Sequence, residues 1–287
     1  MALITKFDPW GSNFCTCPPK LTFNPYTGCD HKCLYCYASS YIPRFFNCRP
    51  KKDLISKLKR DAMRLKGELI SISNSSDPYP NIEAEIGLTR QCLQILCRSR
   101  CEIQIITKST LVIRDVDLLK QAHSMVAMTV TTNDDYLSRV LEPGAPPSSD
   151  RLKAIAKLVS EGIPVSVRID PVIPYLNEDQ HQLIKELASI GVRHITGSTY
   201  KVRPDSWQRI SLAMPELAER LKPLYFEMGE KVGVCKYLPR NLRLKLMEDL
   251  ASLAKMHGLK FAVCRERFTH INTAVCDGSW LIRAGVI

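Results

Sequence analysis

The sequence contains no apolar run of about eighteen residues, the length that a membrane-spanning helix requires. Its first twenty residues also lack a basic stretch followed by a long apolar one, so they do not have the pattern of a secretory signal. Glycine is scarce, at 13 of 287 residues, and we find no repeats or low-complexity tracts. These absences exclude collagen-like and disordered chains, and we expect a folded cytoplasmic protein with no membrane partner.

Acidic residues are few relative to basic ones, 29 against 40, which gives a formal net charge of +11. Residues 44–66 hold nine basic and two acidic residues, and residues 231–267 hold nine and three. Such blocks favour a polyanionic partner such as nucleic acid, although a solvated helix face would give the same pattern. The candidate phosphate contacts in the first block are Lys51, Lys52, Lys59 and Arg60.

Histidine is also scarce, with six residues and no pair at metal-ligand spacing, and we expect His194, beside a strand, to be structural. Cysteine is plentiful at twelve, and a reducing cytosol leaves metal binding, catalysis or burial as its uses. Cys29, Cys33 and Cys36 form a CxxxCxxC pattern in a glycine-led loop directly after the first predicted strand. Three such thiolates can hold three corners of a [4Fe–4S] cluster and leave one iron open. Zinc, with His31 or a distant cysteine as fourth ligand, is the alternative.

The chain alternates short apolar runs with segments of helical periodicity. The predicted strands are residues 21–24, 69–73, 103–107, 125–130, 165–169 and 192–196. Six strand–helix units are too few for a closed eight-stranded barrel, so we predict an α/β fold with a partial (β/α)6 TIM-like barrel. The predicted division is an N-terminal segment (1–20), the barrel (21–200) and a C-terminal extension (201–287). The Pro- and Gly-rich stretch 142–150 is predicted to be a loop within the barrel.

Several further blocks lie where predicted strands end, at the edge where barrel active sites are assembled. They are residues 76–83, 106–109, 114–118, 129–133 and 168–171. With the cysteine pattern, these blocks make the sequence resemble the radical SAM superfamily, and within it the spore photoproduct lyase-like, or DNA repair photolyase-like, branch. The resemblance covers most of residues 20–200.

The resemblance implies that Cys29, Cys33 and Cys36 ligate a [4Fe–4S] cluster whose open iron binds S-adenosylmethionine. An electron from a donor such as ferredoxin or flavodoxin would cleave this cofactor, and the resulting radical would abstract a hydrogen atom. The candidate contacts of S-adenosylmethionine are Tyr35, Ser76, Lys108, Thr129 and Arg168. Lys108 or Arg168 could instead pair with Asp170 or another acid. The catalytic candidates are Tyr37 and Tyr79.

The extension contains Cys235, Cys264 and Cys276, which we predict to hold an auxiliary iron–sulfur cluster. The resemblance supports this prediction, because related sequences end with similar Cys–Arg–Glu and Cys–Asp–Gly motifs. Cys15 and Cys17 could supply a fourth ligand. The alternative is that the three are unrelated buried thiols.

The resulting function prediction is a radical SAM enzyme that modifies or repairs nucleic acid. One alternative is a radical SAM enzyme acting on a peptide or small metabolite, and another is a non-catalytic iron–sulfur or zinc nucleic-acid-binding protein. Splitting of the thymine dimer itself is not expected. In the lyases a cysteine three residues before the Asp of the second-strand turn returns a hydrogen atom, and Asn74 stands there in this chain.

Overall fold

The computed structural model describes residues 2–7 and 14–284, and its centre is an eight-stranded sheet. The strands, in sheet order, are β1 (Thr5–Lys6), β2 (Leu21–Phe23), β5 (Glu68–Ile72), β6 (Cys101–Thr107), β7 (Ser124–Thr129), β8 (Val165–Val172), β9 (His194–Thr199) and β12 (Lys260–Val263). From β2 to β12 all neighbours are parallel, and β1 is antiparallel to β2. Two short pairs, β3 (Tyr26–Thr27) with β4 (Arg49–Pro50) and β10 (Glu230–Val232) with β11 (Cys235–Tyr237), lie outside this sheet.

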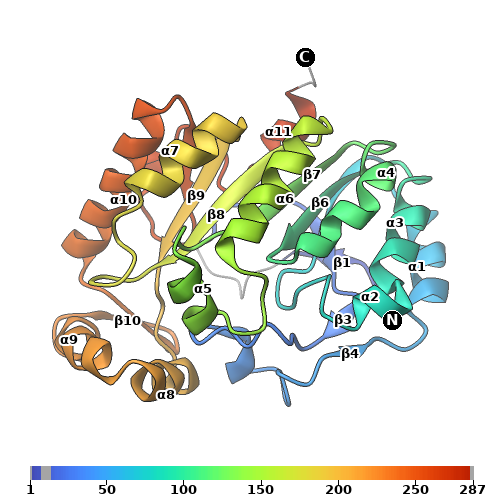
Figure 1. Cartoon of the computed structure of the whole chain (residues 1–287). Helices are drawn as coiled ribbons and strands as arrows, with labels where there is room; N and C mark the ends of the chain where they lie inside the picture. Colours follow the sequence, from blue (N-terminus) through green and yellow to red (C-terminus); the bar gives the residue numbers. More distant parts are fainter. Residues whose placement is uncertain (1, 8–13, 285–287) are drawn as a thin grey trace.

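Helices connect the parallel strands, as right-handed crossovers between parallel neighbours require (Figure 1). They are α1 (Leu54–Ala62), α2 (Glu83–Ile86), α3 (Leu88–Leu96), α4 (Val116–Leu119), α5 (Asp135–Leu141), α6 (Ser148–Ser160), α7 (His181–Ile190), α8 (Pro204–Ala213), α9 (Pro215–Phe226), α10 (Arg240–Met256) and α11 (Trp280–Arg283). Short 3-10 helices span Ala38–Ser40, Thr110–Asp115 and Thr269–Ile271. None of the helices within the described ranges is long and apolar enough to cross a bilayer.

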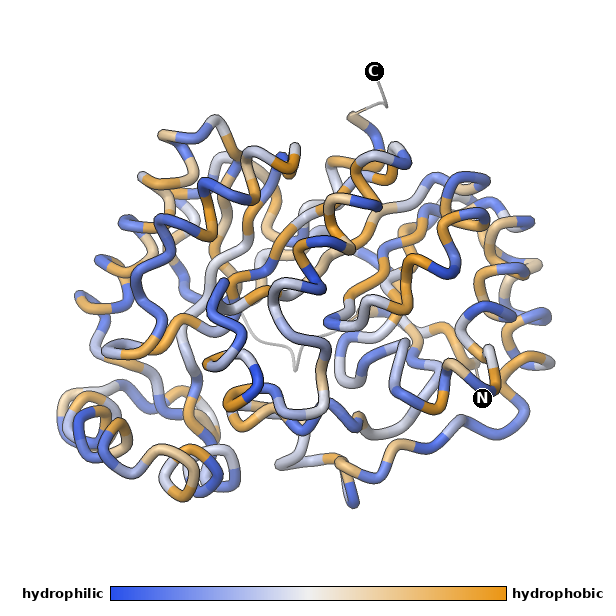
Figure 2. Tube along the Cα trace, in the orientation of Figure 1, coloured by the Kyte–Doolittle hydropathy of each residue, from blue (hydrophilic) through white to orange (hydrophobic). Residues whose placement is uncertain are grey.

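The strands are apolar because both faces of the sheet are covered. In β7, Val126 and Met128 belong to the large core between sheet and helices, whereas Met125 and Ala127 pack with Leu281 of α11 on the other face. Burial on both sides explains why the strands are near-continuous apolar runs without alternation. Figure 2 shows hydrophobic residues concentrated along the central strands.

The predicted partial barrel is confirmed, and all six predicted strands occur within a few residues of their expected positions. The sheet, however, continues beyond residue 200. β12 lies in the predicted extension and pairs with β9, and α10 packs against both strands. Only three of the four β12 residues are buried, which left too short an apolar run to be recognised as a strand.

Candidate iron–sulfur site

The cysteine loop, residues 28–36, follows β3 and lies at the end of the sheet where α5 and α8 also lie (lower part of Figure 1). Gly28 starts the loop at φ +83°, and a Cβ atom there would meet the carbonyl oxygen of Phe45 at 2.3 Å. The next amide, that of Cys29, donates a 2.8 Å hydrogen bond to the same oxygen. Glycine is therefore required by both the backbone conformation and the close approach.

The three thiols of the loop are unbonded to one another and largely withdrawn from solvent. Cys29 and Cys33 are each 8% exposed, and Cys36 is half-buried. Burial raises the pKa of all three, that of Cys33 to about 12 even though the Lys108 ammonium beside it lowers it. In the metal-free chain these side chains are thus protonated thiols at neutral pH.

This donor set fits an iron–sulfur cluster. The described part of the chain contains no group of three or more His, Cys, Asp or Glu side chains arranged to hold a single metal ion. A cubane cluster does not need such convergence, because each thiolate ligates a different iron. His31, the fourth ligand in the zinc alternative, directs Nδ1 to Asp77, with 3.5 Å between Nδ1 and Oδ2.

The Pro- and Gly-rich segment, residues 142–147, clamps the cysteine loop from one side. Leu34 N donates to Leu141 O at 2.8 Å, and Gly144 N donates to His31 O at 2.9 Å. A Cβ on Gly144 would lie 2.1 Å from the Asp30 carbonyl oxygen, so this approach also requires glycine. The predicted loop 142–150 is found up to residue 147, because α6 already begins at Ser148, and the loop also positions the cysteine loop.

Glu142 anchors that segment with a carboxylate that is completely buried. It accepts a hydrogen bond from the Tyr35 hydroxyl and pairs with Arg151, which is equally buried and donates to Thr129 O at 3.0 Å. Burial raises the pKa of Glu142, but Arg151 and Lys108 outweigh it and the pKa is lowered. The carboxylate therefore stays ionised behind the cysteine loop.

Asp77 joins the turn after β5 to the end of β6. Its Oδ1 accepts from Thr107 Oγ1 at 2.8 Å, and its Oδ2 accepts from Lys108 N at 2.8 Å. With His31 also at its carboxylate, this one side chain fixes two strand ends and the cysteine loop.

The two candidate cations for a cofactor carboxylate have different surroundings. Burial lowers the pKa of Lys108, but Cys33 and Glu142 outweigh it and the pKa is raised, so the half-buried Lys108 is an ammonium facing the cysteine loop. Arg168 pairs with Asp170 at 2.7 Å, which is the structural alternative considered from the sequence. Lys108 is thus the cation better placed to bind an added anion.

The other candidates divide between the loop and the core. Thr129 ends β7 behind the cysteine loop, and Ser76 donates to Tyr26 O at 3.2 Å. Tyr37 is 38% exposed, stacks on Tyr41 and donates to Asn74 O at 3.0 Å. It follows Cys36 directly in the sequence, so a partly exposed phenol lies next to the cysteine loop.

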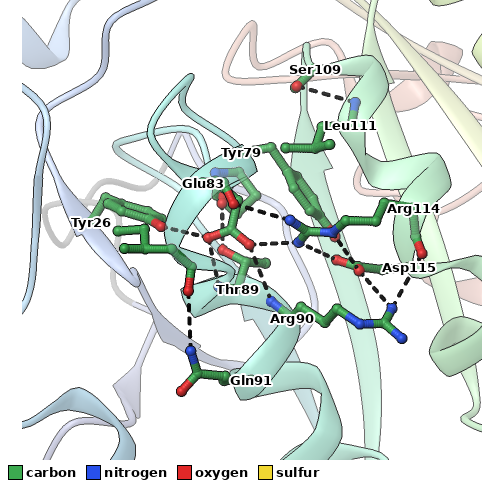
Figure 3. A network of polar contacts seen from close by, with 12 residues as sticks. Tyr26, Tyr79, Glu83, Thr89, Arg90, Gln91, Ser109, Leu111, Arg114 and Asp115 are labelled. Carbon is green, nitrogen blue, oxygen red and sulfur yellow. Dashed lines mark hydrogen bonds and ion pairs between the residues drawn. The ribbon is translucent and has the colours of Figure 1, made fainter.

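Tyr79, the other catalytic candidate, is 1% exposed and lies against a buried ion-pair network (Figure 3). In that network Glu83 accepts from Tyr26 at 2.5 Å and pairs with Arg114 at 2.6 Å, and Arg114 also pairs with Asp115 at 2.9 Å. The blocks 76–83 and 114–118 are therefore in contact, and these ion pairs have a structural role.

Arg209 of α8 is a site residue that the sequence did not reveal. Its guanidinium donates to Leu34 O at 3.0 Å and to Cys36 O at 2.8 Å, and it pairs with Asp205 at 3.1 Å. The predicted extension thus supports the cysteine loop directly. No local signal marks this arginine, because the loop carbonyls that it contacts are more than 170 residues away in sequence.

The cysteines of the predicted auxiliary site have different neighbours. Cys276 Sγ lies 3.3 Å from Cys17 Sγ. Cys264 follows β12 and lies beside the Arg168 guanidinium. Burial lowers the pKa of Arg168, but Cys264 and Asp170 outweigh burial and the pKa is raised. Cys235 begins β11 and pairs with Val232.

The two basic blocks also differ. In the first, Lys52, Lys59 and Arg60 are exposed and Lys51 is half-buried. In the second, Arg243 is 1% exposed and pairs with Glu266 at 3.1 Å, so part of that charge is structural.

Comparison with known proteins agrees with this geometry. The model of the radical SAM superfamily matches residues 23–188. An uncharacterised protein of Mycobacterium tuberculosis is 29% identical over 272 residues, covering 86% of this chain and 77% of the relative. A radical SAM Nα-GlyT isomerase of Pseudomonas phage M6 is 24% identical over 262 residues, covering 84% of this chain and 53% of the phage protein.

Among solved structures, a spore photoproduct lyase variant with bound S-adenosylmethionine and dinucleoside spore photoproduct has a TM-score of 0.62 at 16% identity, covering 85% of this chain and 75% of the other. The methyltransferase TsrM from Kitasatospora setae, with tryptophan and an S-adenosylmethionine analogue, has a TM-score of 0.57 at 13% identity, covering 92% and 58%. The fold is shared with both. The family match spans more than half of the chain, and the protein is an enzyme that belongs to the radical SAM superfamily.

Proposed function

We propose that this enzyme binds a [4Fe–4S] cluster through Cys29, Cys33 and Cys36 and uses S-adenosylmethionine to remove a hydrogen atom from a nucleic-acid substrate. The observation that carries the proposal is the set of three thiols, two buried and one half-buried, in a loop held at the carboxyl ends of parallel strands. When bound, the cluster and its cofactor supply the one-electron chemistry that no side chain can supply.

The residues of this chain bind and orient the cofactor, and they exclude water from it. Lys108, held through its own backbone by Asp77, offers an ammonium for the methionine carboxylate. Tyr35, Ser76, Thr129 and Arg168 remain the proposed contacts of the rest of the cofactor. Tyr37, with 38% of its surface exposed next to Cys36, is the proposed catalytic residue nearest to the cluster, and Tyr79 the more remote candidate.

The substrate class rests on two supports. The spore photoproduct lyase structures hold a dinucleoside lesion on the same fold, and Lys52, Lys59 and Arg60 of the first basic block are exposed. The alternative of a small metabolite is favoured by the tryptophan bound to the Kitasatospora enzyme. Salt dependence separates the two, because phosphate contacts release counterions and a small neutral substrate does not.

The cofactor chemistry is tested with anaerobic protein, dithionite and S-adenosylmethionine. Wild type is expected to be brown and to produce 5′-deoxyadenosine and methionine. The triple variant Cys29→Ala/Cys33→Ala/Cys36→Ala is expected to be colourless and inactive, while the matched variant Cys92→Ala, in the core outside the loop, keeps both properties. Cofactor cleavage that survives in the triple variant would contradict the proposal.

The substrate class is tested by titrating labelled RNA and DNA at increasing salt. Affinity is expected to fall steeply, and charge reversal at Lys51, Lys52, Lys59 and Arg60 is expected to flatten the slope by roughly one unit per lost phosphate contact. Absence of binding at low salt would favour the metabolite alternative.

We further propose an auxiliary cluster and a protein electron donor. An auxiliary cluster on Cys235, Cys264 and Cys276 would bring reconstituted wild type to about eight irons per chain, against about four without it. A small one-electron donor such as ferredoxin or flavodoxin would reduce the enzyme in the cytoplasm, and dithionite replaces it in the assay.

A further inference from the structure

The segment before β2 meets the segment that follows β12. Lys20 and Asp277 form an ion pair of 2.7 Å between Nζ and Oδ2, and both residues are buried. Gln104 of β6 accepts from Lys20 Nζ at 3.1 Å and donates to Asp277 O at 2.8 Å. These contacts fix the segment before β2 against the segment after β12.

Beside this ion pair lie two thiols outside the cysteine loop. One of them, Cys276, is also a ligand of the proposed auxiliary cluster, so the disulfide proposed below and that cluster exclude each other. The sulfurs of Cys17 and Cys276 are 3.3 Å apart, although 259 residues separate them. Cys276 is 3% exposed and its backbone is held by Thr196, whose hydroxyl donates to Cys276 O at 2.7 Å. Cys17 is half-buried and reachable from solvent.

We propose that Cys17 and Cys276 are a covalent modification site at which a low-molecular-weight disulfide forms a reversible Cys17–Cys276 disulfide. Bond formation needs the sulfurs to approach to about 2.05 Å, a movement that side-chain rotation can supply when the backbones are already in place. The Lys20–Asp277 pair provides that placement, because it joins positions three and one residues from the two cysteines.

The exchange follows from the difference in exposure. The Cys17 thiol loses its proton and attacks the small disulfide, forming a mixed disulfide and releasing one small thiol. Cys276, inaccessible to the reagent, then loses its proton and attacks Cys17 Sγ, which breaks the mixed disulfide and releases the second small thiol. The two cysteines lose two electrons and two protons, and both electrons go to the small disulfide.

Cys15 could compete with Cys276 to form a disulfide with Cys17. Its thiol lowers the pKa of Cys17, but the contact with Cys276 and burial outweigh it and raise the pKa. The raised pKa leaves little of the Cys17 thiolate at neutral pH, so exchange is expected over hours, not seconds.

The bond would link the segment before β2 to the segment after β12. The sheet ends at β1 on one side and β12 on the other, and no described strand joins these edges. Cys17 precedes β2, which pairs with β1, and Cys276 follows β12. A covalent link between them closes nearly the whole chain into one loop, and long loops gain most from cross-linking in the chain-entropy model.

The test uses anaerobic full-length protein with its cluster, incubated in buffers of oxidised and reduced glutathione. Free thiols are alkylated after acid quenching, and peptides are mapped by mass spectrometry while visible absorbance confirms that the cluster is retained. We expect a Cys17–Cys276 peptide, reversed by dithiothreitol, and a melting temperature several degrees higher in the oxidised form. The variants Cys17→Ser and Cys276→Ser lose both signals, and Cys15→Ser keeps both.

The control is Cys97→Ser, whose thiol donates to Leu118 O at 3.3 Å elsewhere in the fold and whose loss leaves the cross-link intact. Cys17 and Cys276 alkylated separately at the most oxidising ratio would overturn the proposal. So would a Cys15–Cys17 peptide in its place. Zinc or iron beyond the four cluster irons, lost in both Cys17→Ser and Cys276→Ser, would assign the pair to a metal instead.

Discussion

The guanidinium of Arg209 donates a 2.8 Å hydrogen bond to the carbonyl oxygen of Cys36, the last cysteine of the loop. A second bond reaches Leu34 O, so one side chain of α8 fixes the backbone on both sides of Tyr35. Charge-assisted bonds of this kind to half-buried carbonyls are stronger than neutral ones. The extension thus supports the backbone of the loop that is proposed to bind the cluster.

Arg209→Ala is expected to lower the free energy of unfolding by about 2 kcal/mol and to reduce the iron bound after anaerobic purification. Arg209→Lys should fall between this variant and wild type, because an ammonium cannot reproduce the two-pronged contact. Iron analysis and urea unfolding measure the two effects. Arg220→Ala on α9, which removes a guanidinium 4.1 Å from the Tyr175 ring centre, is the control, and iron loss equal in both variants would contradict the assigned role.

Glu142→Gln is expected to destabilise the chain by about 3 kcal/mol, because it leaves Arg151 charged and buried without its counter-ion. The double variant Glu142→Gln/Arg151→Gln should lose clearly less than the sum of the two single variants, since both partners are then neutral. Urea unfolding of the four proteins measures the coupling. Additive losses would show that the two side chains do not act as a pair.

The sequence was sufficient to predict the cysteine loop and the six strands, because both are written in local patterns of spacing and apolarity. It could not predict Arg209, Glu142 or Asp77 as supports of the loop. Their contacts join residues 31 to 175 positions apart, and a single arginine or carboxylate carries no periodicity. Tyr79 illustrates the converse, since its motif position suggested chemistry and the structure buries it against Arg114 and Asp115.

His194 makes stability depend on pH. Burial lowers its pKa to about 4, with Arg168 acting in the same direction, so the folded chain keeps the imidazole neutral beside Ser166. The unfolded chain takes up a proton near its ordinary value of 6.5, and stability is therefore lost as pH falls from 6.5 towards 4. Over the whole range from pH 6.5 to pH 4, the loss in free energy of unfolding is about 3 kcal/mol.

We expect His194→Gln to flatten the fall in unfolding free energy between pH 7 and pH 5 relative to wild type. The exposed His123→Gln is the matched control and should leave the pH dependence unchanged. Urea unfolding of the metal-free proteins at several pH values measures the slopes. Parallel curves for wild type and His194→Gln would show that this histidine is not the titrating group.

The position of Asn74 argues against repair of the thymine dimer of spore DNA. Its side-chain amide Nδ2 donates to Thr22 Oγ1 at 2.6 Å, and its backbone carbonyl oxygen accepts from the Tyr37 hydroxyl at 3.0 Å. An amide N–H bond is much stronger than a thiol S–H bond, so hydrogen transfer from Asn74 to a carbon radical would be slow or uphill. The resemblance to the lyases implies that Asn74 occupies the position of their cysteine donor. Reduced enzyme incubated with S-adenosylmethionine and a dimer-containing oligonucleotide should cleave the cofactor without restoring the thymines, as measured by chromatography of the digested oligonucleotide. Repair above a trace would mean that another hydrogen donor, such as Tyr37, serves the product radical.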